Sequence, residues 1–478
     1  MPETKPPTAI WRVLLPAFFV ACFWLNQGVS RAHLEAMRNE IFPAPSEHVA
    51  SVAWYPLAFA YHRAIDEQMY FETAGVVFGR DADRAWLAKS RGTVSEAFNV
   101  PLPPADGRFH APYTEVPLEY PPSGLPALLL PRLLASSFEG YARIFGLEMG
   151  LCLVAAFALA LATLRRGGAT DREIAQRGWL AAGLLLAEGS LAIQRLDAMT
   201  ALFLALMLHA AIVRRHALFG LSSGLAVAAK LIPAIVIPSI VLADPGAWKG
   251  TAARVRAAIA FAVAMVIGFG PLAFAPGAFR AIVGYHATRG LQVESTLGIL
   301  WGTLRALAGK AAPATYSFGS LNFDDPVADA LAKGATILTL GVAGWLAWRA
   351  FRSAPGGGDG PARARHLALV LFAAVVSLWL TGKVFSPQYM TWALPLALAI
   401  PGKDGLKLVW GMIATLTLTQ IYMRGYYPAI IAQEAIGLVT LLVRQAMLVA
   451  LAVFAIRALT SVPQAEKPAI SPPTEMSV

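Results

Sequence analysis

The chain has few charged residues for its length. Only 14% of its 478 residues are Asp, Glu, Lys or Arg, whereas 57% are hydrophobic and the mean hydropathy is +0.56. A soluble protein contains about a quarter charged residues, so this chain lacks the polar surface that a water-exposed globule needs. Long apolar runs recur from Trp11 to Arg457, and they predict a protein whose main solvent is lipid.

Cysteines and cofactor motifs are also scarce. Cys22 and Cys152 both fall in apolar runs, so we expect reduced thiols and no disulfide framework. The sequence contains no GxxxxGK[ST] loop and no GxGxxG turn after a strand, which disfavours a soluble nucleotide-binding domain. The eight histidines show no HExxH and no other metal-ligand spacing. We therefore expect no metal and no cofactor.

About twelve apolar runs predict helices that cross the membrane. The first is longer than the apolar core of a signal peptide and has no clear cleavage site, so we expect a retained anchor. Some runs are short for a bilayer about 30 Å thick and predict tilted helices. The runs lie at roughly 10–28, 141–164, 178–193, 198–213, 217–229, 232–243, 256–275, 334–350, 366–382, 389–401, 407–423 and 431–457.

Basic residues occupy alternate connections between these runs. By the positive-inside rule, that side is the cytoplasm, with both chain termini on it. This explains most of the formal net charge of +10, and basic residues scattered in this way disfavour nucleic-acid binding. The basic groups are Arg165, Arg166, Arg172 and Arg177; Arg214 and Arg215; Lys249, Arg254 and Arg256; Arg349, Arg352, Arg363 and Arg365; and Lys403 and Lys407.

Two long segments, at 30–140 and 276–333, fall on the opposite side. Within the first, Val49–Tyr61 and Gly124–Leu134 are apolar but short, which is typical of helices that lie in the membrane interface. We therefore predict an all-α polytopic membrane protein, with one transmembrane domain at 1–460 and large extracytoplasmic loops. The polar, Pro-rich residues 461–478 predict a disordered cytoplasmic tail.

Tight turns on the extracytoplasmic side each contain a cation, where topology does not favour positive charge. Lys230 is the clearest case, because Pro233 follows it and breaks the helix there. We favour a ring of cations that binds a lipid phosphate; the alternative is that each cation reaches outward to lipid head groups. Separately, Arg195 and Asp197 can pair with each other, and such a pair could still orient a ligand. The turns are IQRLD with Arg195 and Asp197, AAKLIP with Lys230, TGKVFSPQY with Lys383 and MRGYYP with Arg424.

Carboxylates and further polar groups lie in the two long segments. Most carboxylates in loops of this size are simply solvated, and for the polar run in the second segment a functional and a bland interpretation have equal weight. The groups are Asp66 and Glu67 in YHRAIDEQMYFETAGVVFG, Glu119 and Tyr120 in LEYPP, and His286, Arg289, Gln292 and Glu294 in GYHATRGLQVES.

These segments together resemble the family 87 glycosyltransferases of the GT-C superfamily. The similarity rests on the order and spacing of four segments between about Asp66 and Pro395. In chain order they are EYPPSGLPALLLP, QRLDAMTALFLALMLHAAIVRRHALFGLSSGLAVAAKLIP, RGLQVES and KVFSPQYMTWALP. Each motif is weak alone. The resemblance implies a GT-C bundle and an enzyme that moves a sugar, commonly mannose, from a polyprenyl-phosphate donor to a hydroxyl of a glycolipid or glycan.

The resemblance also implies roles for individual residues. The family's acidic base in the first outer loop falls on Asp66, which is followed by Tyr70 and Gly79, although residues 30–60 intervene as an apparent insertion. A positioned carboxylate can take the proton of an attacking sugar hydroxyl, and cations stabilise the leaving phosphate without a metal. One carboxylate and direct attack predict inversion. The expected phosphate-binding residues are Arg195, Lys230, His286, Arg289 and Lys383; the expected substrate-binding residues are Glu67, Tyr70, Glu119, Tyr120, Asp197, Gln292, Glu294, Gln388, Tyr389 and Arg424.

Other hypotheses remain open at this point. The donor sugar can be a pentose or glucose, and Glu67 or Glu119 can replace Asp66 as the base. A transporter or flippase for a polyprenyl-linked sugar would need the same cations, but it predicts inverted repeats with broken helices at the midplane, and no such repeat is visible. A third hypothesis is a purely structural scaffold, which would not explain the cations in the extracytoplasmic turns. We expect the plasma (inner) membrane as the location, with the active site on its extracytoplasmic face.

Overall fold

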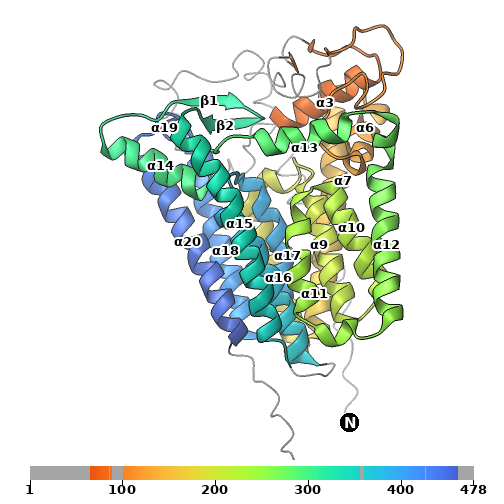
Figure 1. Cartoon of the computed structure of the whole chain (residues 1–478), viewed down its shortest axis with the longest axis vertical. Coiled ribbons are helices and arrows are strands. Elements are labelled where there is room, and N and C mark those ends of the chain that lie inside the picture. The colour runs from red at the N-terminus through yellow and green to blue at the C-terminus, as the bar shows by residue number, and fades with distance from the viewer. Residues whose placement is uncertain (1–64, 85–86, 89–100, 356–359, 426, 461–478) are drawn as a thin grey trace, which may run out of the picture.

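A computed structural model describes residues 65–84, 87–88, 101–355, 360–425 and 427–460. That part of the chain is mostly helical, with a single short hairpin among its described residues (Figure 1). The elements are α3 (Ile65–Val77), α6 (Leu125–Leu134), α7 (Phe138–Arg166), α8 (Asp171–Glu188), α9 (Asp197–Ile212), α10 (His216–Ala229), α11 (Ile237–Leu242), α12 (Thr251–Phe269), α13 (Ala278–Thr288), α14 (Thr296–Leu307), β1 (Ala314–Ser317), β2 (Ser320–Phe323), α15 (Pro326–Arg352), α16 (Pro361–Thr381), α17 (Leu394–Ala399), α18 (Gly402–Gly425), α19 (Tyr427–Ile431) and α20 (Ala435–Thr460).

Six of the described helices are long and apolar enough to cross a bilayer, which confirms a helical membrane protein. The other predicted runs correspond to shorter or interrupted helices, and the first run, at 10–28, lies outside the described residues, so the count of about twelve crossings stays a prediction. The six span Phe138–Arg166, Thr251–Phe274, Pro326–Arg352, Pro361–Thr381, Gly402–Met423 and Ala435–Leu459.

The interruptions have a local cause in the sequence. Helix α10 ends at Ala229, Lys230 has an extended backbone, and the chain continues as the 3-10 turn η4 (Ile232–Ile235) around Pro233. A proline cannot donate a backbone hydrogen bond and clashes with the preceding turn of a helix. The predicted helix break after Lys230 is therefore confirmed. The run at 389–401 is likewise divided between the 3-10 helix η7 (Pro387–Ala393) and α17.

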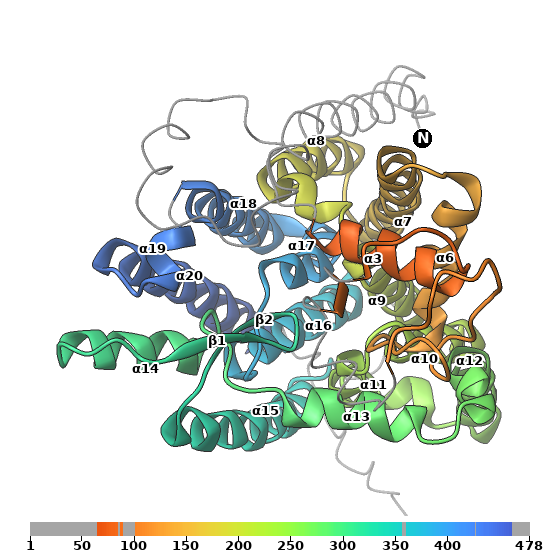
Figure 2. The same ribbon diagram turned by 90° about the horizontal axis from the view of Figure 1, so that it is seen from above.

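Two ends of the bundle differ in structure. Helices α3, α6, α13, α14 and α19 and the β-hairpin gather at one end of the long helices, which we call the hairpin end (Figures 1 and 2). Gly124–Leu134 contains the predicted short helix, α6, and exposes Leu130, Leu133 and Leu134 on its surface. Val49–Tyr61, the other predicted interfacial helix, lies outside the described residues, as does the predicted tail at 461–478.

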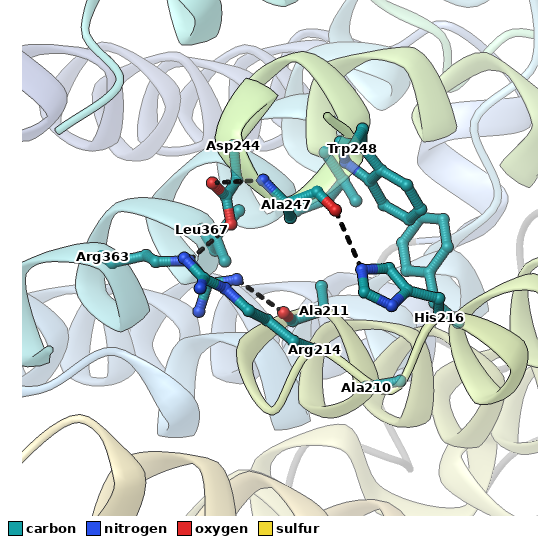
Figure 3. A pocket seen from close by; sticks show the side chains of 11 residues that line it. Ala210, Ala211, Arg214, His216, Asp244, Ala247, Trp248, Arg363 and Leu367 are labelled. Atoms are coloured by element: carbon teal, nitrogen blue, oxygen red, sulfur yellow. Dashed lines mark hydrogen bonds and ion pairs between the residues drawn. The ribbon is translucent and has the colours of Figure 1, made fainter. Parts of the chain in front are cut away.

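The basic connections meet at the opposite end, which we call the basic end. Figure 3 shows Arg363, at the start of α16, beside Asp244 and the end of α9. Its guanidinium donates to the Ile212 and Ala211 carbonyls at 2.8 Å each, and its Nε lies 2.5 Å from Asp244. Arg177 of α8 donates to the Gly402 carbonyl at 2.8 Å. These contacts join connections that the basic-residue pattern placed on one side, so that part of the prediction is confirmed.

Helix α16 forms the centre of the bundle. Nearly all of its residues from His366 to Trp379 are buried, and they pack among α9, α11, α15, α17 and α20. A helix that is apolar on all sides is expected to be surrounded by other helices. The residues that follow α16 therefore emerge from the middle of the bundle at the hairpin end, and this places Lys383 at the centre of that end.

Candidate functional site

A cavity of about 350 Å³ lies at the hairpin end of the bundle. Its walls come from α3, from the loop before α6, from the turn between α10 and η4, from α13, from the hairpin turn, from α15 and from the segment between α16 and η7. This volume falls in the range of small-molecule sites. Its acidic, basic and histidine lining residues are Asp66, Glu119, Lys230, His286, Arg289 and Lys383.

The structure brings together most of the residues singled out from the sequence. Asp66, Glu119, Tyr120, Lys230, His286, Arg289, Lys383, Gln388 and Tyr389 all line this cavity. Glu67, Tyr70, Arg195, Asp197 and Gln292 do not line it, but they contact or neighbour residues that do. Glu294 lies elsewhere, and the side chain of Arg424, although its backbone belongs to α18, falls outside the described part.

Asp66 is held by Arg195. It occupies the first turn of α3, and its Oδ2 lies 2.5 Å from Arg195 Nε, which comes from the turn before α9. Arg195 is mostly buried, whereas the Asp66 side chain is 23% exposed and lines the cavity. An ion pair with one open side fixes the direction of a carboxylate and leaves an oxygen available to a ligand. The alternative in which Arg195 pairs with Asp197 is therefore wrong, since Arg195 pairs with Asp66 and Asp197 with Lys230.

Asp197 instead holds Lys230. The lysine Nζ donates to Asp197 Oδ1 at 2.6 Å, and Trp392 Nε1 donates to the same oxygen at 2.6 Å. Lys230 Nζ also lies 4.5 Å from the Tyr389 ring centroid and 5.2 Å from that of Trp392. A cation over aromatic faces with one buried carboxylate has little freedom to move. The helix break at Lys230 thus presents a positioned ammonium group to the cavity.

Glu67 has a different environment from its neighbour Asp66. It is buried, and its Oε1 has no hydrogen-bond partner among the described residues. Burial raises the pKa of Glu67 to about 8, against the lowering effect of Arg195. The group is therefore mainly protonated at neutral pH. Close by, Tyr70 and Tyr120 share a hydrogen bond of 3.1 Å and pack edge to face, so this pair joins α3 to the loop before α6 beside the cavity.

Helix α13 and the segment after α16 contribute the remaining polar groups. Arg289 donates to Ser320 Oγ at 2.8 Å, and Lys383 Nζ donates to the Ala287 carbonyl at 2.7 Å. Burial and the nearby Arg289 lower the pKa of His286 to about 4. The imidazole is therefore neutral at neutral pH and can bind an anion only through a hydrogen bond. Arg289, Lys383 and Lys230 supply the positive charge of the cavity.

Glu294 takes part in a buried cluster away from the cavity. Its Oε2 lies 2.8 Å from Arg444 Nη1 and accepts a hydrogen bond from Tyr422 at 2.6 Å. Arg444 also donates to the Glu294 carbonyl at 2.7 Å. The cluster fastens the segment before α14 to α18 and α20. Gln292 makes a different contact, since its side-chain amide nitrogen donates to Ser386 Oγ at 3.3 Å and joins the segment before α14 to the segment between α16 and η7.

Aromatic residues of the cavity are the main omission of the sequence analysis. Four further aromatic residues line it: Tyr285, Phe318, Trp379 and Trp392. Trp392 also donates a hydrogen bond to Asp197. Phe318 lies in TYSFGSLNF, where two short runs flank the two-residue turn Phe318–Gly319. Two-residue hairpin turns are recognised in a sequence by pairs such as Asn-Gly or Asp-Gly, so Phe-Gly gave no clear signal. The tryptophans lie inside apolar runs and give no separate signal in the sequence.

The wall of the cavity towards the bundle interior is apolar. Ile232 and Ile235 of η4, Leu340 of α15, and Leu378 of α16 line it. A separate void of about 10 Å³, with room for about one water molecule, also has Ile235, Thr339 and Leu378 in its wall and lies between α11, α15 and α16. The larger cavity therefore combines charged groups with an apolar wall on the side of the bundle interior.

No cluster of three or more metal-binding side chains occurs in the part of the chain that the structure describes. A scan against protein-family models finds no match, and no curated protein matches the sequence. The functional argument therefore depends on the residues of the site.

Proposed function

We propose that this protein is a membrane glycosyltransferase with a GT-C-type bundle of about twelve transmembrane helices. The observation that carries the proposal is the composition of one cavity. It combines an accessible carboxylate, Asp66, with three cations and an apolar wall on the side of the bundle interior. The carboxylate suits acid–base chemistry on a hydroxyl. The cations suit the binding of a phosphate, and the apolar wall suits the binding of a lipid chain.

In the proposed reaction, a hexosyl group, mannosyl in the first instance, moves from a polyprenyl-phosphate donor to a glycolipid or glycan. The acceptor hydroxyl gives its proton to the Asp66 carboxylate while its oxygen attacks the anomeric carbon. The bond between that carbon and the phosphate oxygen breaks, and its electron pair stays on the polyprenyl phosphate. Lys230, Arg289 and Lys383 stabilise the developing charge, and attack from the opposite face inverts the anomeric configuration.

The surroundings of the carboxylates favour Asp66 as the base. Glu67 is buried and, with a pKa of about 8, is mainly protonated at neutral pH. Glu119 lines the cavity but is 7% exposed, whereas the Asp66 side chain is more open and oriented by Arg195. We therefore assign the proton transfer to Asp66 and a positioning role to Arg195.

Transport of a polyprenyl-linked sugar is the alternative function. It would use the same cations, but the polar lining gathers at one end of the bundle, and Arg363 and Arg177 fasten the opposite end. A single terminal site that contains a carboxylate suits transfer better than alternating access. We place the site on the extracytoplasmic face of the plasma membrane, with both termini in the cytoplasm.

Purified protein in nanodiscs tests the proposal when it is given polyprenyl-phosphate mannose, glucose or a pentose together with a membrane glycolipid. We expect release of one polyprenyl phosphate for each sugar transferred, an inverted linkage, and the same rate with EDTA. Binding of the donors without transfer of any sugar would contradict the enzyme and support a transporter.

A further inference from the structure

The β-hairpin at the hairpin end has an unusual turn. Strands β1 and β2 pair from Ala314↔Phe323 to Ser317↔Ser320, which leaves Phe318 and Gly319 as a two-residue loop. Both residues have positive φ, 53° and 69°. Turns of this type normally contain Asn, Asp or Gly, because a side chain with a Cβ fits poorly there. A phenylalanine at this position is held in a strained conformation, and such strain is often associated with function.

The ring of Phe318 projects into the cavity described above. It lines the cavity and lies 5.1 Å from the ring centroid of Tyr285, which is also a lining residue. Tyr316, two residues earlier, is 41% exposed and lies within electrostatic range of Asp66, Arg195 and Arg289. The turn therefore contributes the aromatic residue Phe318 to the cavity wall, and Tyr316, which does not itself line the cavity, lies near its charged groups.

Neighbouring segments hold this turn firmly in place. Asn322 Nδ2 donates to the Ser317 carbonyl at 2.7 Å, and Arg289 donates to Ser320 Oγ at 2.8 Å. The backbone of β2 bonds to the segment before α14, from Val293 N to Leu321 O at 3.1 Å and from Phe323 N to Leu291 O at 2.9 Å. One of these bonds joins the two strands, and the others join β2 to Arg289 and to the segment before α14, so the strained turn extends from an anchored strand.

We propose that the hairpin tip, Tyr316–Gly319, is the binding platform for the acceptor sugar. This inference rests on the proposed function. A pyranose ring has an apolar face of C–H groups that matches an aromatic ring, and hydroxyls that match a phenol. The acceptor must reach Asp66, and Phe318 and Gly319 of the tip line the same cavity as Asp66. In Figure 2 the hairpin lies beside α16, on the side from which α3 also approaches. The donor's lipid chain would occupy the apolar wall around Ile235 and Leu378, away from the hairpin.

Phe318→Asn removes the aromatic ring but allows the turn to keep its conformation, because Asn tolerates positive φ. For Phe318→Asn, we expect the KM for the acceptor to rise about tenfold, in line with the loss of one aromatic contact. The donor KM and the rate at saturating acceptor should change little. The unfolding temperature should stay equal or rise, because the backbone strain is relieved. Phe318→Tyr should restore the acceptor KM, and Phe109→Asn, at an exposed aromatic residue outside the cavity lining, is the matched control.

The outcomes separate this inference from the proposed function. Absence of transfer by the wild-type protein contradicts the function itself. Transfer by the wild type with an unchanged acceptor KM in Phe318→Asn contradicts the platform alone, as does a rise in the donor KM. A lower unfolding temperature with a proportional loss of all activity would give Phe318 a structural role and would also overturn the inference.

Discussion

At the scale of single residues, the site depends on how its charges are paired. Lys230 is bound by Asp197 and covered by Tyr389 and Trp392, so its ammonium has one preferred position. Removing one partner of a buried pair leaves the other charge uncompensated. The proposed phosphate site therefore depends on a residue, Asp197, that does not itself line the cavity.

Asp197→Asn tests this dependence. The variant keeps the size of the side chain but removes its charge, so Lys230 loses its counterion and its fixed direction. We expect the donor KM to rise about tenfold, with a smaller effect on the acceptor KM. Asp404→Asn is the control, because it breaks a similar contact of 2.5 Å, with Arg365, at the basic end. Equal effects of both variants on donor binding would contradict the assignment.

Glu67 gives the protein a pH-dependent stability. The pKa of its carboxyl is about 8 in the folded protein and 4.5 in the reference state, because burial disfavours the charged form. Above pH 4.5 the unfolded chain loses this proton and the folded chain keeps it, so stability falls as the pH rises towards 8. We expect the unfolding temperature of Glu67→Gln to vary less than that of the wild type between pH 5 and 8. An identical pH dependence in the two proteins would disagree with this prediction.

Most of the charged residues that line the cavity were singled out from the sequence, but their partners were not. Lys230 and Lys383 are conspicuous as charges between apolar runs, and Arg289 belongs to a dense polar run. Which carboxylate meets which cation depends on contacts between distant segments, as for Asp66 with Arg195 and Glu294 with Arg444. The neutral state of His286 also follows from burial, which a sequence does not specify.

At the scale of elements, α10 and α12 pack through small residues. A Cβ at Gly224 would lie 2.5 Å from Ala264 Cβ, and one at Gly220 would overlap the Ala257 carbonyl. Gly220 and Gly224 form a GxxxG pattern, which allows close approach of helices in membranes. This packing positions the end of α10, and so the turn that contains Lys230.

Gly224→Leu should separate the two helices. A leucine cannot fit against α12, and overpacking of this kind costs about 1–3 kcal/mol or more. We expect a clearly lower unfolding temperature in detergent. Gly341→Leu on α15 is the matched control, because a Cβ at Gly341 meets no heavy atom within 4 Å. Similar unfolding temperatures for the two variants would contradict the packing described for α10.

The positions of the helices along the chain agree closely with the predicted apolar runs, whereas their lengths and helix types agree less well. Prolines interrupt the runs at 232–243 and 389–401 and give short 3-10 and α-helical pieces in their place. The prediction of an all-α protein missed the hairpin, because strands of four residues each are too short to show a periodicity.

At the scale of the whole molecule, the distribution of charge predicts the orientation. The basic connections meet at one end, and the cavity lies at the other. If the basic end is cytoplasmic, a cysteine at Lys310, exposed on the hairpin end, should react with a membrane-impermeant thiol reagent in whole cells. A cysteine at Lys249, exposed at the basic end, should react only after lysis. Both variants need Cys22 and Cys152 replaced by Ser, and the reversed labelling pattern would invert the proposed topology.

The most direct test of the account compares sugar transfer by Asp66→Asn with transfer by Glu67→Gln in the same nanodisc assay. The two carboxylates are adjacent in sequence, but only Asp66 lines the cavity. With donor binding and folding intact, we expect Asp66→Asn to lose at least about 100-fold in rate and Glu67→Gln to stay within a few-fold of the wild type. Undiminished transfer by Asp66→Asn would contradict the central claim and move the search for the base to Glu119.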